Sequence, residues 1–196
     1  LCHLPNAPDV EAIALKAAGL RERRSALRRE LGFSDRPTLL FAGRLIPKKG
    51  VHIAISAIAG IDEAGRQDLV IVGDGPERQK LVQLADRLGV GDRVRFAGFV
   101  QPADMVCWYV ASELFVLPST ETWGVVVSEA LAAGVPVVVS DQVGCHPDIV
   151  RDNRVGRVVS RDDVPAWAVA VTESLEKASK TEQVLSHWQP VFEQLR

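Results

Sequence analysis

Residues 114–130 read LFVLPSTETWGVVVSEA, and this stretch predicts a strand, a loop and a helix in succession. Its first four residues are apolar without alternation, as is typical of a strand buried on both faces of a sheet. Gly124 precedes the helical part, where the first backbone N–H groups lack partners within the helix and favour an anion. Glu121 in the loop and Glu129 in the helix flank this position. They are either two ligand-binding carboxylates, or a loop charge and a solvated helix position.

The same alternation of strand and helix recurs along the chain. Apolar runs predict strands at 38–43, 69–73, 93–97, 114–117, 135–140 and 156–160. Helical patterns fall near 21–31, 50–60, 76–89, 103–111, 125–134, 147–152, 163–178 and 182–195. Such alternation implies a parallel sheet with right-handed crossovers. We therefore expect an α/β fold with three layers, a doubly wound, Rossmann-like parallel sheet between two layers of helices.

Composition limits the classes of protein and site. The 196 residues are 47% apolar and 24% charged, enough for one domain with its own core. A net charge of −2 argues against a nucleic-acid partner. The scattered Cys2, Cys107 and Cys145 indicate reduced thiols in a cytoplasmic protein. His3, His52 and His187 have no carboxylate or cysteine at ligand spacing, so no metal is predicted. No apolar run approaches the roughly 18 residues of a membrane-spanning helix.

The chain begins without Met, and its first nine residues, LCHLPNAPD, hold two prolines and an asparagine. This composition predicts a linker or turn. We expect residues 1–196 to be one domain of a longer protein, with residues 1–20 as an interdomain linker region.

A run of arginines follows this segment. They are Arg21, Arg23, Arg24, Arg28 and Arg29. Leucines 20, 27 and 31 fall on one side of the same predicted helix. The run is either a solvated helix face above a core stripe or a surface for anionic lipid head groups.

The loop after the first predicted strand, residues 43–50, reads GRLIPKKG. Its glycines allow close backbone approach to a ligand, Arg44 can grip two phosphate oxygens, and Lys49 supplies a point charge. It is not a Walker loop, because the G-x4-G-K-[ST] pattern is absent. No acidic residue stands in this loop, so we expect both charges to be free for a phosphate. An ordinary basic loop is the alternative.

Other motifs also follow predicted strands, where ligands of doubly wound sheets bind. Residues 73–76, GDGP, favour a sharp turn into a helix. Gly98, Phe99 and Val100 are compatible with a base-binding backbone or with a simple turn. His146 follows the fifth strand and is either a ligand contact or a solvated loop residue.

Taken in order, these segments resemble the retaining glycosyltransferases of family 4 (glycosyl transferases group 1), which have the GT-B fold. The matching residues are His3-Leu4-Pro5-Asn6, Gly43-Arg44-Leu45, Lys49-Gly50, Val72-Gly73-Asp74-Gly75-Pro76, Phe96-Ala97-Gly98, Pro118-Ser119, Glu121, Gly124, Glu129-Ala130 and Ala133-Gly134-Val135-Pro136-Val137-Val138. They cover nearly the whole chain. The resemblance implies that this chain is the C-terminal, donor-binding half of such an enzyme, and that the N-terminal acceptor domain, its missing partner, is absent.

The resemblance also implies roles for individual residues. Arg44 and Lys49 would bind the donor diphosphate and, with Glu121 facing the donor sugar, form the catalytic set. Glu129 would bind the ribose. The backbone of Trp123, Gly124, Val125 and Val126 would hold sugar hydroxyls and a phosphate, and Phe99 and Val100 would hold the base.

The function implied is transfer of a sugar from a nucleoside diphosphate sugar, with UDP or GDP, to a hydroxyl acceptor in polysaccharide, lipopolysaccharide or glycolipid synthesis. No cofactor is expected, and this hexosyltransferase fragment alone is expected to be inactive. An acceptor at a membrane surface would place a cytoplasmic enzyme on the inner face of the membrane. The alternatives are a non-catalytic nucleotide- or protein-binding module, or a sugar-nucleotide epimerase of the same fold.

This sequence departs from the family pattern at four positions. Thr122 and Trp123 stand where Gly-Phe is usual, and Cys145 and Asp148 where a second Gly and a Glu are usual. Thr122 and Trp123 place side-chain bulk where the backbone usually approaches the sugar closely. The identity of the donor sugar therefore stays open. The last predicted helix carries Trp188 and Phe192 on one face, which would pack either on the missing domain or on this domain's own sheet.

Overall fold

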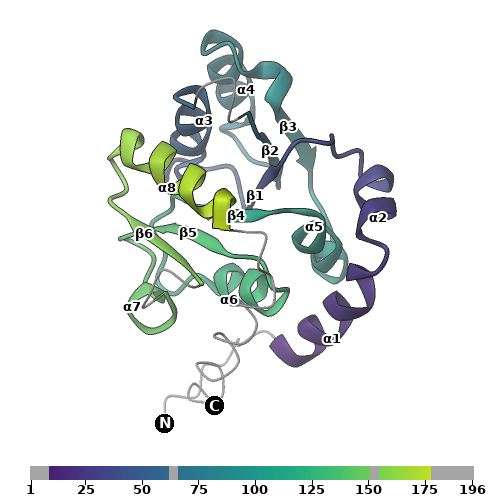
Figure 1. The fold of residues 1–196 in the computed structure, drawn as a ribbon. Helices are drawn as coiled ribbons and strands as arrows, with labels where there is room; N and C mark the ends of the chain where they lie inside the picture. The colour runs from purple at the N-terminus through teal and green to yellow at the C-terminus, as the bar shows by residue number, and fades with distance from the viewer. Residues whose placement is uncertain (1–8, 62–65, 151–154, 178–196) are drawn as a thin grey trace.

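The computed structural model describes residues 9–61, 66–150 and 155–177 (Figure 1). Residues 1–8, with the predicted turn, and the predicted helix at 182–195 with Trp188 and Phe192 lie outside the described residues.

Among the described residues the chain forms a six-stranded sheet in which every pair of neighbours is parallel. The strands are β1 (Thr38–Ala42), β2 (Asp68–Val72), β3 (Val94–Gly98), β4 (Leu114–Leu117), β5 (Val137–Ser140) and β6 (Gly156–Val159). Their order is β3-β2-β1-β4-β5-β6. The chain runs outward from β1 to β3 and then returns to place β4 beside β1, which makes this junction the topological switch point.

The helices cover the sheet in two layers (Figure 1). They are α1 (Val10–Arg21), α2 (Arg24–Glu30), α3 (Val51–Ala59), α4 (Arg78–Arg87), α5 (Met105–Ala111), α6 (Val125–Ala132), α7 (His146–Ile149) and α8 (Val164–Lys177), with 3-10 turns η1 (Pro47–Lys49), η3 (Gly91–Arg93) and η4 (Pro102–Asp104). Helix α3 packs against α4 and α8, whereas α1, α2 and α6 contact one another or α5 on the other side. The predicted three-layer, doubly wound α/β fold is confirmed.

The central strands of the sheet form an apolar core. Strands β1, β4 and β5 are buried at every residue, because both faces lie under helices. This burial explains why the strands show no alternation of polar and apolar residues.

Helix α1 was not predicted, and it occupies residues that we assigned to a linker region. Asp9 caps it by accepting a hydrogen bond from the Ala12 N–H at 3.0 Å. Ala17 is fully buried where α1 packs on α5 and α6. The prolines and the asparagine on which the linker prediction rested all precede this helix, so they give no information about residues 10–20. A link from this segment to another domain stays a prediction.

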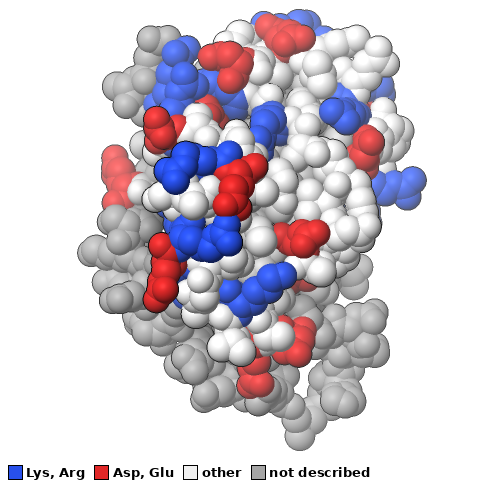
Figure 2. All heavy atoms as spheres, turned by 90° about the vertical axis from the view of Figure 1, so that its right-hand side faces the viewer, with Lys and Arg blue, Asp and Glu red and all other residues white. Residues whose placement is uncertain are grey.

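The predicted solvated helix face above a core stripe is confirmed in part, because Leu27 is buried and Arg23 is exposed, whereas Arg24 and Arg28 have protein partners. Arg24 and Arg28 both pair with Glu113, which also accepts a hydrogen bond from the Thr38 N–H at 2.7 Å. Arg24 and Arg28 also donate to backbone carbonyls at the end of α5, so they fasten α2 to the start of β4. Figure 2 shows basic and acidic side chains interleaved on this side of the molecule, and not the single-sign surface that anionic lipids attract.

Candidate functional site

A cavity of about 520 Å³ lies at the carboxyl ends of β1 and β2. Its lining residues are Ala42, Gly43, Arg44, Val72, Gly73, Asp74, Phe99, Val100, Pro102, Met105, Tyr109, Val126 and Glu129. The predicted site residues among them are Arg44, Phe99, Val100, Val126 and Glu129. They come from three separate segments: the loop after β1, the loop after β3, and helix α6. The structure therefore brings together groups for which we predicted phosphate, base and ribose contacts.

Close backbone packing forms one wall of this cavity. The Gly43 N–H donates to the Val72 carbonyl at 3.0 Å, and the Gly73 N–H donates to the Gly98 carbonyl at 2.7 Å. Gly73 has a φ of 125°, and a Cβ atom there would lie 1.9 Å from the Gly43 carbonyl oxygen. Only glycine fits this position, so the ends of β1, β2 and β3 are held at fixed separations.

The carboxylate of Glu129 is oriented by a buried tyrosine. Tyr109 is 1% exposed, and its hydroxyl donates to Glu129 Oε2 at 2.8 Å. Burial raises the pKa of Glu129, and the Tyr109 hydrogen bond opposes that rise. Burial also raises the pKa of Tyr109, with the adjacent Glu129 charge as a further cause. In this pair the Tyr109 hydroxyl is the hydrogen-bond donor and the Glu129 carboxylate is the acceptor. Sequence reasoning missed Tyr109, because no motif marks a contact across 20 residues.

Lys49 and Glu121 do not line the cavity. They form an ion pair with each other, from Lys49 Nζ to Glu121 Oε1, and their side chains are only 18% and 14% exposed. The expectation that Lys49 has no acidic neighbour is wrong, because the partner comes from a loop 72 residues away. Lys49 nevertheless borders the site, since a Cβ atom on the lining residue Gly43 would lie 3.7 Å from Nζ.

The start of helix α6 brings Val126 to the cavity, whereas Trp123, Gly124 and Val125 are not among the lining residues. Gly124 precedes the helix with a φ of 101°, and a Cβ atom on it would lie 2.7 Å from Val143 Cγ1. The Trp123 carbonyl accepts from the Cys145 N–H at 2.8 Å, and the indole packs partly against the core.

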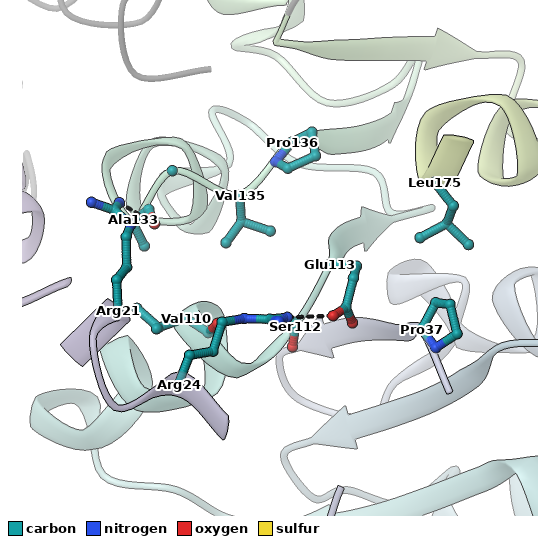
Figure 3. A pocket seen from close by; sticks show the side chains of 11 residues that line it. Arg21, Arg24, Pro37, Val110, Ser112, Glu113, Ala133, Val135, Pro136 and Leu175 are labelled. Carbon is teal, nitrogen blue, oxygen red and sulfur yellow. Dashed lines mark hydrogen bonds and ion pairs between the residues drawn. The ribbon is translucent and has the colours of Figure 1, made fainter. Parts of the chain in front are cut away.

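Another cavity, of about 450 Å³, opens at the opposite edge of the sheet (Figure 3). It lies beside Pro37 and Glu113, which precede β1 and β4. Arg24 is paired with Glu113, and Arg21 donates to the Ala133 carbonyl at 2.8 Å. None of the predicted site residues lines it, and these charged groups already have protein partners.

In the described part of the chain, no group of three or more His, Cys, Asp or Glu side chains is arranged to hold a metal ion. Within the same residues, no helix combines the length and hydropathy that crossing a membrane requires. His146 opens the short helix α7 and lies outside the lining of the cavity.

The chain matches the family described as Glycosyl transferases group 1 over residues 23–186. It is 34% identical over 178 residues to alpha-D-kanosaminyltransferase of Streptomyces kanamyceticus, covering 90% of this chain and 46% of that protein. It is 36% identical over 163 residues to GDP-mannose-dependent alpha-(1-6)-phosphatidylinositol monomannoside mannosyltransferase of Mycobacterium tuberculosis (strain CDC 1551 / Oshkosh), covering 78% and 42%.

The fold is similar to that of HepE from Anabaena, solved in complex with UDP and glucose. The TM-score is 0.76 and the identity 29%, over 88% of this chain and 48% of that one. This chain thus spans about half the length of these three proteins. It belongs to the glycosyl transferases group 1 family, and its sheet and helices form one half of a GT-B enzyme.

Proposed function

We propose that this domain binds the nucleoside diphosphate sugar of a retaining glycosyltransferase, which transfers the sugar to a hydroxyl acceptor during glycoconjugate synthesis. The observation that carries the proposal is the cavity at the switch-point edge, which gathers Arg44, Phe99 and Glu129 from three segments. Relatives named for GDP-mannose, and a neighbour that holds UDP, support a UDP or GDP donor.

The base and the ribose are assigned to the part of the cavity that Phe99 and Glu129 line. Phe99 is 71% exposed although it is aromatic, and it lines the cavity, so its ring can stack on a base. Glu129 offers a carboxylate that accepts ribose hydroxyl hydrogen bonds. Tyr109 holds that carboxylate in place before the nucleotide arrives. Because Glu129 is fixed in advance, binding costs little side-chain entropy.

The diphosphate belongs near Arg44, Lys49 and the start of α6. Two side-chain cations and the partial positive charge of a helix N-terminus attract an anion. In the transfer step the bond from the anomeric carbon to the diphosphate oxygen breaks, and the acceptor oxygen bonds to the same face of the sugar. The acceptor proton passes to the departing phosphate. The cationic groups stabilise the negative charge that develops on this leaving group.

The acceptor site belongs to a second domain, because this chain spans about half the length of its relatives. Closure of the two domains would orient the acceptor hydroxyl, and lost orientation costs several kcal/mol of barrier. A membrane-surface acceptor is part of this proposal, since one relative is named for a phosphatidylinositol mannoside. We expect this chain alone to bind nucleotide and to transfer no sugar.

Isothermal titration calorimetry with UDP, GDP and ADP tests the proposal. We expect one nucleotide to bind, and Arg44→Ala to weaken that binding about tenfold, because a charge-assisted hydrogen bond contributes about 1.5–3 kcal/mol. Arg23→Ala is the matched control, since Arg23 forms an exposed ion pair with Glu30 outside the cavity. Absence of binding for all three nucleotides, or equal effects of the two variants, would overturn the proposal.

A further inference from the structure

The ion pair between Lys49 and Glu121 joins two groups with different expected tasks. The proposed function places the diphosphate at Lys49, and the family resemblance implies that Glu121 faces the sugar. In this structure each instead neutralises the other, and both side chains are mostly buried. A mostly buried pair is less screened by water than a surface pair, so its partners exchange only for groups that compensate them.

The backbone holds both members of the pair in position. The Glu121 N–H donates to the Gln142 carbonyl at 3.0 Å, and the Glu121 carbonyl accepts from the Gly144 N–H at 3.0 Å. Lys49 ends the η1 turn, and Gly50 follows it with a φ of 64°. A Cβ atom on Gly50 would lie 2.0 Å from the Pro118 carbonyl oxygen, so the Lys49 loop is packed tightly against the end of β4. The pairing follows from fixed backbones on both sides.

We propose that Glu121 is a specificity-determining residue that competes with a bare diphosphate for Lys49, and thereby favours the nucleotide sugar over the free nucleoside diphosphate. This inference rests on the proposed function. A nucleoside diphosphate that reaches Lys49 must take over the cation while the Glu121 carboxylate stays close by. The carboxylate then loses its partner and repels the phosphates.

A nucleotide sugar changes this balance, because its sugar hydroxyls are hydrogen-bond donors. They replace Lys49 as partners of Glu121 and release the ammonium group to the diphosphate. The substrate therefore satisfies both members of the pair, whereas the nucleoside diphosphate product satisfies only Lys49. The same difference favours release of the product after transfer.

The test compares nucleoside diphosphates with nucleotide sugars on the variant Glu121→Gln. The probes are UDP with UDP-glucose and GDP with GDP-mannose, measured by calorimetry on this chain. Glu30→Gln is the matched control, because Glu30 is also ion-paired but is exposed. We expect Glu121→Gln to bind the nucleoside diphosphate about three- to tenfold tighter, the effect of removing one partly screened ion pair. The preference for the nucleotide sugar falls accordingly. In a Lys49→Ala background the same substitution gives little gain.

Several outcomes would overturn the inference. Unchanged or weaker nucleoside diphosphate binding by Glu121→Gln means that Glu121 does not compete, and instead positions Lys49 for the phosphate. If Glu121→Gln strengthens nucleoside diphosphate binding equally in the Lys49→Ala background, then Glu121 does not act by competing for Lys49. Circular dichroism checks that each variant is folded, and Glu121→Ala is a second variant with the same expected direction. If the unaltered chain binds no nucleotide, the proposed function itself fails, and the inference fails with it.

Discussion

Replacing Lys49 by alanine leaves the Glu121 carboxylate without its cation, in a place where only 14% of its side chain is exposed. Surface ion pairs contribute about 0–1 kcal/mol to stability, and removing one partner of a fully buried pair costs about 3–5 kcal/mol. This pair lies between those limits, because both side chains are mostly but not completely buried. We expect Lys49→Ala to lower the free energy of unfolding by about 1–3 kcal/mol.

Urea denaturation followed by tryptophan fluorescence measures this difference, since the chain has four tryptophans. Arg23→Ala is the control, because its pair with Glu30 is about half exposed on both sides, and should change stability by less than about 1 kcal/mol. The double variant Lys49→Ala/Glu121→Gln should recover much of the loss, since no unpaired charge remains. If Lys49→Ala costs no more than Arg23→Ala, the pair does not hold the loop and the reasoning is refuted.

Three more predictions concern single side chains. Tyr109→Phe should weaken nucleoside diphosphate binding about five- to tenfold and change binding of the 2′,3′-dideoxy analogue much less, as measured by calorimetry; equal losses would place the ribose elsewhere. Burial raises the pKa of Glu129, so its ionised form destabilises the folded state above that pKa, and this penalty disappears as pH falls through it. Glu129→Gln should therefore be more stable than the unaltered chain at neutral pH, with a difference that shrinks on acidification; a pH-independent difference in urea denaturation would contradict this. Burial raises the pKa of the Cys145 thiol to about 12, so iodoacetamide at about pH 8 should modify Cys145 in urea but not in the native protein, as mass spectrometry of its peptide would show; rapid native labelling would contradict the burial.

The strands were predictable because strands buried on both faces appear as short, uninterrupted apolar runs. The runs at 114–117 and 38–43 match β4 and β1 to within a residue. Helix α1 was missed because prolines just before it suggested a linker, although Asp9 supplies a cap. The sequence does not show which distant residue a cation will meet. Lys49 therefore seemed free, and Arg24 and Arg28 seemed solvated, although each has an acidic partner far along the chain.

The candidate site was partly predictable for a related reason. Arg44, Phe99 and Glu129 each follow a strand, and the carboxyl ends of parallel strands meet at one edge. Tyr109 lies within a helix on no recognisable motif, so its hydrogen bond to Glu129 becomes visible only in three dimensions.

The most direct test of the central claim, that a nucleotide binds at the switch-point cavity, uses the single tyrosine of this chain. Protein made with 3-fluorotyrosine carries one ¹⁹F probe, at Tyr109, whose hydroxyl contacts the Glu129 carboxylate. Titration with UDP or GDP should shift this one resonance saturably, with the dissociation constant that calorimetry gives, and Glu129→Gln should diminish the shift. Nucleotide binding that leaves the resonance unmoved, or no binding at all, would contradict the proposed site.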